Sequence, residues 1–424
     1  MRFYHIGILL AAPLWAQQQT MKLTLAEAEQ LAIQNNPQFS AAKFNAAAAA
    51  QVPLEFYAGL LPTVTGAITG VGADSGSRLA AGGLNNPVVY DRLASGLIVN
   101  QLVTDFGRTG NLIASAKLRA QAQDQVTETA RATILITTAR AYFGVLRARA
   151  VLTVAQQTVS ARQLVSDQVT ALANSNLKSG LDVSFANVNL ADAQLLLSQA
   201  QNNVKAAEAE LAAALGLPLQ TLFSLQDEPV PGPLSGSVDP WVMQAIQDRP
   251  ELKDLRLEQS AAERFAKAEH SLNYPTIAIA GTAGFVPVGE AAVPGRYGAI
   301  GVNVSIPVFN GGLFKSRQTE AALKAKAANE NVNDLANRVT RDVRVAFLNT
   351  QTAFERVGLT AQLLKQAQLA LDLARGRYDL GLSSIVELSQ AQLNLTSAQI
   401  GTASAQYDYQ TVRAILDYQV GALR

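Results

Sequence analysis

The chain has 424 residues, no cysteine and two histidines, and its 34 basic and 33 acidic side chains leave a net charge of +1. The absence of cysteine excludes disulfides, thiolate catalysis and cysteine metal sites, and His270, the one histidine beyond residue 16, cannot form a multi-histidine metal site. The balanced charge provides no basic field for nucleic acid. We therefore expect no enzyme activity, no catalytic residue, no metal, no cofactor and no nucleic-acid partner.

Residues 1–16 have the layout of a secretory signal peptide. Arg2 is followed by an apolar run from Ile6 to Leu14 and by the small residue Ala16. This run is too short to cross a membrane. The rest of the chain has no run of 18 uncharged apolar residues, so we expect no inner-membrane helix.

The remaining sequence contains one pattern twice. Ala32-Ile33-Gln34 and Pro37 match Ala245-Ile246-Gln247 and Pro250 at an offset of 213. Further matches follow in the same order: Pro62-Thr63-Val64 with Pro275-Thr276-Ile277, Val103-Thr104-Asp105-Phe106-Gly107 with Val308-Phe309-Asn310-Gly311-Gly312, and, at an offset of 201, Gly180-Leu181 with Gly381-Leu382. We predict a tandem duplication, with one structural repeat at 23–217, a Pro/Gly-rich linker at 218–240 and a second repeat at 241–424.

Proline marks where long helices can form. No proline occurs at 88–217 or at 308–424, and an interior proline would break a helix. We predict long coiled-coil hairpins at about 107–215 and 312–421, whose first helices of roughly 67 residues would extend about 100 Å. Gly180 and Gly381 are expected to stop these helices, because glycine tolerates the positive φ that a helix end requires.

Between the helices, short segments alternate apolar and small polar residues, as strands do. We predict β-hairpins at about 61–104 and 274–308, with loops at 76–87 and 287–297. A small soluble sheet would also fit these segments. If the strands lie in lipid, four of them cannot close, so two, three or four protomers would supply 8, 12 or 16 strands.

These motifs together resemble the TolC-like outer membrane efflux proteins over essentially the whole mature chain. The most specific pieces are Asn35-Asn36-Pro37, Asp105-Phe106-Gly107, Pro307-Val308-Phe309-Asn310-Gly311-Gly312 and Arg377-Tyr378-Asp379-Leu380-Gly381-Leu382. The resemblance implies a mainly α fold with a small β part. Long helical hairpins would form a periplasmic barrel, and four strands per protomer would contribute to a trimeric 12-stranded barrel in the outer membrane of a Gram-negative bacterium.

The resemblance also implies function and partners. The homotrimer would contact outer-membrane lipid, a periplasmic adaptor (membrane fusion) protein and an inner-membrane pump of RND or ABC type, and would passively export what the pump delivers. Its cargo and the class of its pump are not readable from this sequence. The alternative from another class is a periplasmic coiled-coil scaffold or adaptor without a pore, which would not need paired strand hairpins.

Site residues follow from the same resemblance. The pore gate maps to Glu387, Gln390 and Tyr378, although Glu387 also fits a solvated residue at a helix start. The adaptor-docking turns map to Gly180, Leu181, Gly381, Leu382 and Ser383, where each glycine is also explained as a helix stop. At the tip, the sequence differs from the pattern of the family at three positions. Gln390 stands in place of a second aspartate, Ser383 stands in place of the tip arginine, and Ala186 stands in place of an acidic residue of the first hairpin. The tip is then held by Tyr378 and packing, or is less tightly closed.

Overall fold

The computed structural model describes residues 21–78, 88–218, 223–289 and 291–423, so the predicted signal peptide lies outside the described residues. The chain divides into two compact units. The first comprises residues 1–37, 131–242 and 342–424, and the second comprises residues 38–130 and 243–341. Each unit therefore takes segments from both sequence repeats. Among the described residues, no helix is long and apolar enough to cross a membrane.

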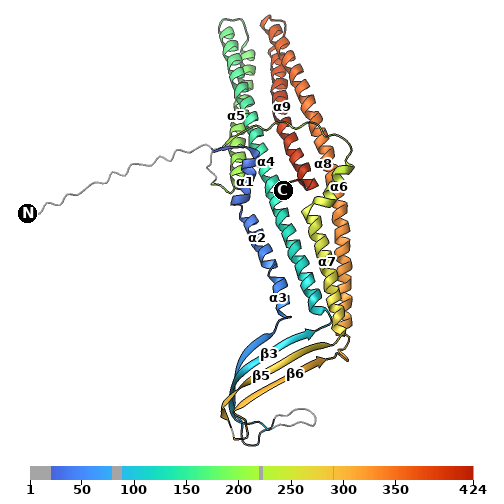
Figure 1. The fold of residues 1–424 in the computed structure, drawn as a ribbon. Helices are drawn as coiled ribbons and strands as arrows, with labels where there is room; N and C mark the ends of the chain where they lie inside the picture. The colour runs from blue at the N-terminus through green and yellow to red at the C-terminus, as the bar shows by residue number, and fades with distance from the viewer. Residues whose placement is uncertain (1–20, 79–87, 219–222, 290, 424) are drawn as a thin grey trace, which may run out of the picture. The chain divides into compact units, whose positions relative to one another are not determined.

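The same order of elements occurs twice along the chain (Figure 1). The first set comprises α1 (Leu25–Asn35), α2 (Pro37–Ala49), α3 (Val52–Ala58), β2 (Thr63–Val71), β3 (Arg92–Thr104), α4 (Arg108–Asn174) and α5 (Gly180–Ala214). The second set comprises α6 (Asp239–Asp248), α7 (Pro250–His270), a 3-10 turn (Ser271–Asn273), β5 (Thr276–Gly289), β6 (Arg296–Ser305), α8 (Leu313–Asp379) and α9 (Ile385–Val420). The predicted fold class, mainly α with a small β part, is confirmed.

Pro37 and Pro250 have the same structural role in the two sets. Each is the first residue of its helix, α2 or α7. Proline suits this position because the first N–H of a helix has no intrahelical partner and the fixed φ of proline is already helical.

The first unit contains α5, α9 and the parts of α4 and α8 that follow residues 130 and 341. Alanines spaced seven residues apart are buried on α5 and on α9: Ala186, Ala193 and Ala200 on α5, and Ala391, Ala398 and Ala405 on α9. The Cα atoms of these two helices approach within 8 Å, and Asn189 Nδ2 donates to Ser389 Oγ at 2.7 Å. The small residues therefore allow close packing between α5 of one hairpin and α9 of the other.

The predicted linker at 218–240 contains a strand that the sequence pattern did not indicate. In the first unit, β4 (Phe223–Leu225) pairs in parallel with β1 (Met21–Leu23). The buried Tyr142 hydroxyl lies at this pair and donates to the carbonyl oxygens of Leu23, at 3.0 Å, and Gln226, at 2.6 Å. Three residues are too few for an alternating pattern to be recognised, which explains why these strands were missed.

The second unit contains one four-stranded antiparallel sheet in the order β2-β3-β5-β6 (Figure 1). The predicted loop at 287–297 is too long, because β5 continues through Pro287 to Gly289 and β6 begins at Arg296. The register with β3 shifts between Leu93 and Ser95, opposite this proline. Proline has no N–H for the ladder, so a bulge is where a paired strand can accept it.

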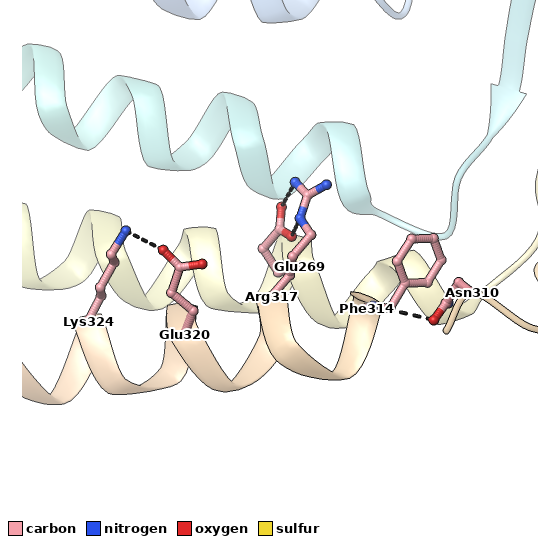
Figure 2. Close-up of polar contacts among 6 residues, drawn as sticks. All are labelled: Glu269, Asn310, Phe314, Arg317, Glu320 and Lys324. Atoms are coloured by element: carbon pink, nitrogen blue, oxygen red, sulfur yellow. Dashed lines mark hydrogen bonds and ion pairs between the residues drawn. The ribbon is translucent and has the colours of Figure 1, made fainter. Parts of the chain in front are cut away.

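Each second strand of a pair turns into its long helix through a polar cap. Asp105 Oδ2 accepts from Thr109 N at 2.7 Å, and Asn310 Oδ1 accepts from Phe314 N at 3.5 Å (Figure 2). The residues between cap and helix adopt positive φ in both corners: Phe106 and Gly107 in one, Gly311 and Gly312 in the other. These corners explain the Asp105-Phe106-Gly107 and Asn310-Gly311-Gly312 motifs as strand-to-helix turns.

An ion pair with a buried carboxylate joins α7 to α8 in the second unit (Figure 2). The Glu269 carboxylate is 2% exposed and meets the Arg317 guanidinium through two contacts, Nε to Oε2 at 2.7 Å and Nη2 to Oε1 at 3.1 Å. Glu269 lies in the last turn of α7, where the helix dipole disfavours an anion. Arg317 therefore compensates both the burial and the position of this carboxylate.

Candidate gating and docking site at the helical turns

The turns of the two hairpins lie in the first unit and share one backbone design. After α4, Asn176 adopts φ +58° and Leu177 N donates to Leu172 O at 2.9 Å. After α8, Gly381 adopts φ +71° and Leu382 N donates to Arg377 O at 2.8 Å. Both are Schellman endings, in which a residue with positive φ satisfies the last helical carbonyls.

The helices that follow begin in the same way. Ser179 caps α5 and accepts from Asp182 N, and Ser384 caps α9 and accepts from Glu387 N. These serines are 205 residues apart, as are the positive-φ residues Asn176 and Gly381. The structural offset through the turns is therefore 205.

This offset corrects the sequence alignment of the turns. Gly180 is the first residue of α5 and does not have a positive φ, so it is not the helix stop that we predicted. The stop is Asn176, the non-glycine residue that best tolerates this conformation. With an offset of 205, the structural counterpart of Glu387 is Asp182. The first hairpin therefore carries an acidic residue at this position, and Ala186, which the sequence alignment had placed there, lies four residues further on.

The two acidic residues have different partners. The Asp182 carboxylate accepts from the backbone N and the hydroxyl of its own cap, Ser179. These hydrogen bonds lower the pKa of Asp182. The Glu387 carboxylate instead lies 3.1 Å from Arg377 Nε, and both side chains are exposed. The residue that matches Arg377 in the first hairpin is Leu172, so this ion pair exists in one hairpin only.

Tyr378 joins the two hairpins. Its ring is buried in an apolar cluster with Val169 and Ala186 of the first hairpin and Ile385 and Leu388 of the second. Lys178 Nζ, from the turn of the first hairpin, lies 3.7 Å from the centre of the Tyr378 ring.

The Tyr378 hydroxyl is buried without a hydrogen-bond partner among the described residues. Burial, with smaller contributions from Asp182 and Asp379, raises the pKa of this phenol. The predicted gate residues therefore occupy two environments, since Tyr378 is packed whereas Gln390 is exposed and donates to Asn394 Oδ1 at 3.0 Å.

The predicted docking residues surround the same turns. Leu177 is 69% exposed and Leu382 is 67% exposed, at equivalent positions, and Leu181 is also exposed. A side chain at Gly180 would meet no atom within 4 Å, whereas Gly381 has the positive φ that disfavours any side chain. Ser383 is half-buried, and its hydroxyl has no hydrogen-bond partner among the described residues.

Sequence reasoning missed Lys178, Asp182 and the pairing of Arg377. Asp182 had a readable signal, since Ser-x-x-Asp before an apolar run is a capping box and recurs as Ser-x-x-Glu at 384–387. Arg377 and Lys178 had no readable signal in the sequence, because the residues they contact depend on how the chain folds back. No group of three or more His, Cys, Asp or Glu side chains in the described part of the chain could hold a metal ion.

Comparison with solved structures defines the class of protein. The outer membrane protein VceC from Vibrio cholerae has the same fold, with a TM-score of 0.81 at 19% sequence identity, over 94% of this chain and 96% of that one. The fold is therefore that of the outer-membrane channels with long helical hairpins.

Sequence comparison identifies the family. The family model for "Outer membrane efflux protein" matches residues 28–217 and 241–422. Outer membrane protein TolC from Salmonella enteritidis is 27% identical over 94% of this chain and 83% of its own length. The alkaline protease secretion protein AprF from Pseudomonas aeruginosa is 24% identical over 96% of this chain and 86% of its own length. The chain belongs to the outer membrane efflux protein family, and it is an exit duct in the outer membrane of a Gram-negative cell.

Proposed function

We propose that three copies of this chain close one channel that passes substrates from an inner-membrane pump, through a periplasmic adaptor, to the outside. The observation that carries the proposal is the four-stranded sheet. Within the described residues, β2 and β6 are the edges of this sheet, and each has one unpaired side. Unpaired backbone groups in lipid cost several kcal/mol each, so each edge requires another strand.

The strand directions support closure by copies of the same chain. All neighbouring strands are antiparallel, so β2 and β6 run in opposite directions. The β6 edge of one copy can therefore pair with the β2 edge of the next in the same antiparallel manner. Three copies give a ring of 12 strands, which is large enough to leave a lumen.

We place the gate at the turns of the helical hairpins. Three exposed Glu387 carboxylates around one axis would form an anionic ring that attracts cations and repels anions. Contact between Lys178 and Tyr378 would hold the two hairpins of each copy together in the closed state. The exposed leucines of the turns would meet the adaptor, and the pump, of RND or ABC type, would set the choice of cargo.

Engineered cysteines test the assembly, since the chain has none of its own. Thr65→Cys on β2 is combined with a single cysteine at successive positions of β6, from 300 to 304, in the outer-membrane fraction. We expect disulfide-linked species of two and three chains at some position of the scan. The control pair Leu97→Cys and Ala283→Cys, which face each other inside the sheet, should link within one chain only. Absence of linked chains at all positions, or species larger than three, would contradict the trimer.

A further inference from the structure

A groove in the first unit is lined by residues of three helices. It lies between α4, α8 and α9 and has a volume of about 250 Å³. Most of its walls are apolar, with Val165, Val169, Leu172, Leu371, Leu388 and Leu395 among the lining residues. A groove of this composition suits the apolar part of a small molecule.

Arg162 of α4 lines the groove and is 4% exposed. Its Nη1 is buried without a hydrogen-bond partner, and no described residue forms an ion pair with its guanidinium. Burial lowers the pKa of Arg162 to about 10, and Asp192 of α5 acts in the opposite direction without pairing with it. The side chain is therefore still a cation at neutral pH, and a buried cation is costly unless an anion pairs with it.

The charged residues of the groove favour an anion at the Arg162 end over the opposite end. Tyr378 and Asp379 line one end, with the unpartnered Tyr378 hydroxyl. Val169, which packs against Tyr378, is seven residues from Arg162 on the same helix, so the two ends are roughly 10 Å apart. The Asp379 carboxylate disfavours an anion at its end. The exposed Arg375 is the third charged residue of the lining, and it lies one turn before Asp379 on α8.

We propose that this groove binds an amphipathic carboxylate, such as a medium-chain fatty acid, with the carboxylate on Arg162 and the apolar chain extending past Val165 and Leu371 toward Tyr378. The planar guanidinium matches a carboxylate through two parallel hydrogen bonds. The apolar walls of the groove would contact the hydrocarbon chain of the acid. This inference goes beyond the exit-duct function and does not depend on the gate or on the adaptor.

Photolabelling tests the proposal on the purified full-length protein in a neutral maltoside detergent. The probe is decanoic acid carrying a diazirine on its chain. We expect saturable labelling of peptides from α4, α8 and α9 that decanoate suppresses and decanol does not. Arg162→Leu should weaken apparent binding by about tenfold or more, as expected for loss of a charge-assisted hydrogen bond. Arg162→Lys keeps the charge but loses the two parallel hydrogen bonds, so it should weaken binding less than Arg162→Leu does.

The matched control is Arg140→Gln, an exposed arginine on the same helix, which should leave labelling unchanged. Migration of each variant as the assembled protein separates a binding defect from misfolding. Equal competition by decanol, undiminished labelling of Arg162→Leu, or no saturable labelling of the groove would each overturn the proposal. Protection of the groove peptides by the adaptor alone, without labelling by the acid, would assign the groove to a protein partner and overturn it as well.

Discussion

Asp182 and Glu387 occupy the same position, the third residue of the helix after each turn, but only Glu387 forms an ion pair with the preceding helix. Arg377 stands where the first hairpin has Leu172, so the first hairpin has no cation at that position. Asp182 is occupied by hydrogen bonds to its own cap, Ser179. The two turns thus share the same backbone conformation but differ in their charged side chains. This difference favours the second hairpin as the location of the proposed gate.

The first prediction concerns Glu387→Ala. Replacing three glutamate side chains by alanine at a narrow axis should raise single-channel conductance, because the constriction becomes wider. It should also weaken block by multivalent cations, because the anionic ring that attracts them is lost. Measurement in planar bilayers, with and without a trivalent cation, gives both quantities. Unchanged conductance together with unchanged block would remove Glu387 from the mechanism.

The second prediction concerns Arg377→Gln, which should change block by multivalent cations in the opposite direction to Glu387→Ala. Arg377 neutralises part of the Glu387 charge through the 3.1 Å ion pair, so Arg377→Gln should strengthen block by multivalent cations in the same assay. Asp182→Asn is the matched control at the equivalent position and should leave block unchanged. If Arg377→Gln and Glu387→Ala shift block in the same direction, the ion pair holds the turn in shape and does not tune its charge.

Much of this site was readable from the sequence because it depends on local rules. The proline-free stretches and turn residues predicted the long hairpins. The alignment of Gly180 with Gly381 is wrong because Asn176, and not Gly180, ends α4 with a positive φ of +58°. The contact between Lys178 and Tyr378 was not predictable, since it joins residues 200 positions apart through packing that no periodicity records.

The third prediction concerns that contact. Lys178→Met removes the cation over the Tyr378 ring, an interaction worth about 0.5–2 kcal/mol, and should increase the fraction of time that channels spend open. Tyr378→Ala should have a larger effect, since it also removes the ring from the buried cluster. Tyr378→Phe keeps the ring, and its hydroxyl has no partner among the described residues, so this variant should behave as wild type. A large opening effect of Tyr378→Phe would show that the hydroxyl, and not the ring, holds the hairpins.

The fourth prediction concerns the proposed adaptor contact. Leu177→Asp and Leu382→Asp place charges on two exposed leucines at equivalent turn positions. Both should abolish export while leaving the assembled protein intact, because a charge is costly in an apolar interface. Leu382→Met, which keeps the apolar surface, is the control. Gly381 is unsuitable for this test because its positive φ would strain any other residue. Full export by both aspartate variants would exclude the turns as a contact surface.

The last prediction concerns stability in the second unit. Glu269→Gln leaves Arg317 without its anion, and Arg317→Gln leaves a carboxylate that is 2% exposed without its cation. The second change should be the more damaging, since a buried charge without a partner costs about 3–5 kcal/mol and the end of α7 adds an unfavourable dipole. The loss of stability in Arg317→Gln should lie at the low end of this range, because Arg317 is itself 42% exposed. The temperature at which the assembled protein dissociates should therefore drop most for Arg317→Gln.

The nearby pair of Lys324 and Glu320 on α8 provides a matched control. It has a similar short contact, 2.6 Å, but both side chains are exposed (Figure 2). Water already solvates these charges, so Glu320→Gln should change the dissociation temperature little. The double change Glu269→Leu with Arg317→Leu should recover part of the stability lost in Arg317→Gln, because no unpaired buried charge remains. If Arg317→Gln and Glu320→Gln have equal effects, burial of Glu269 does not determine the strength of its ion pair.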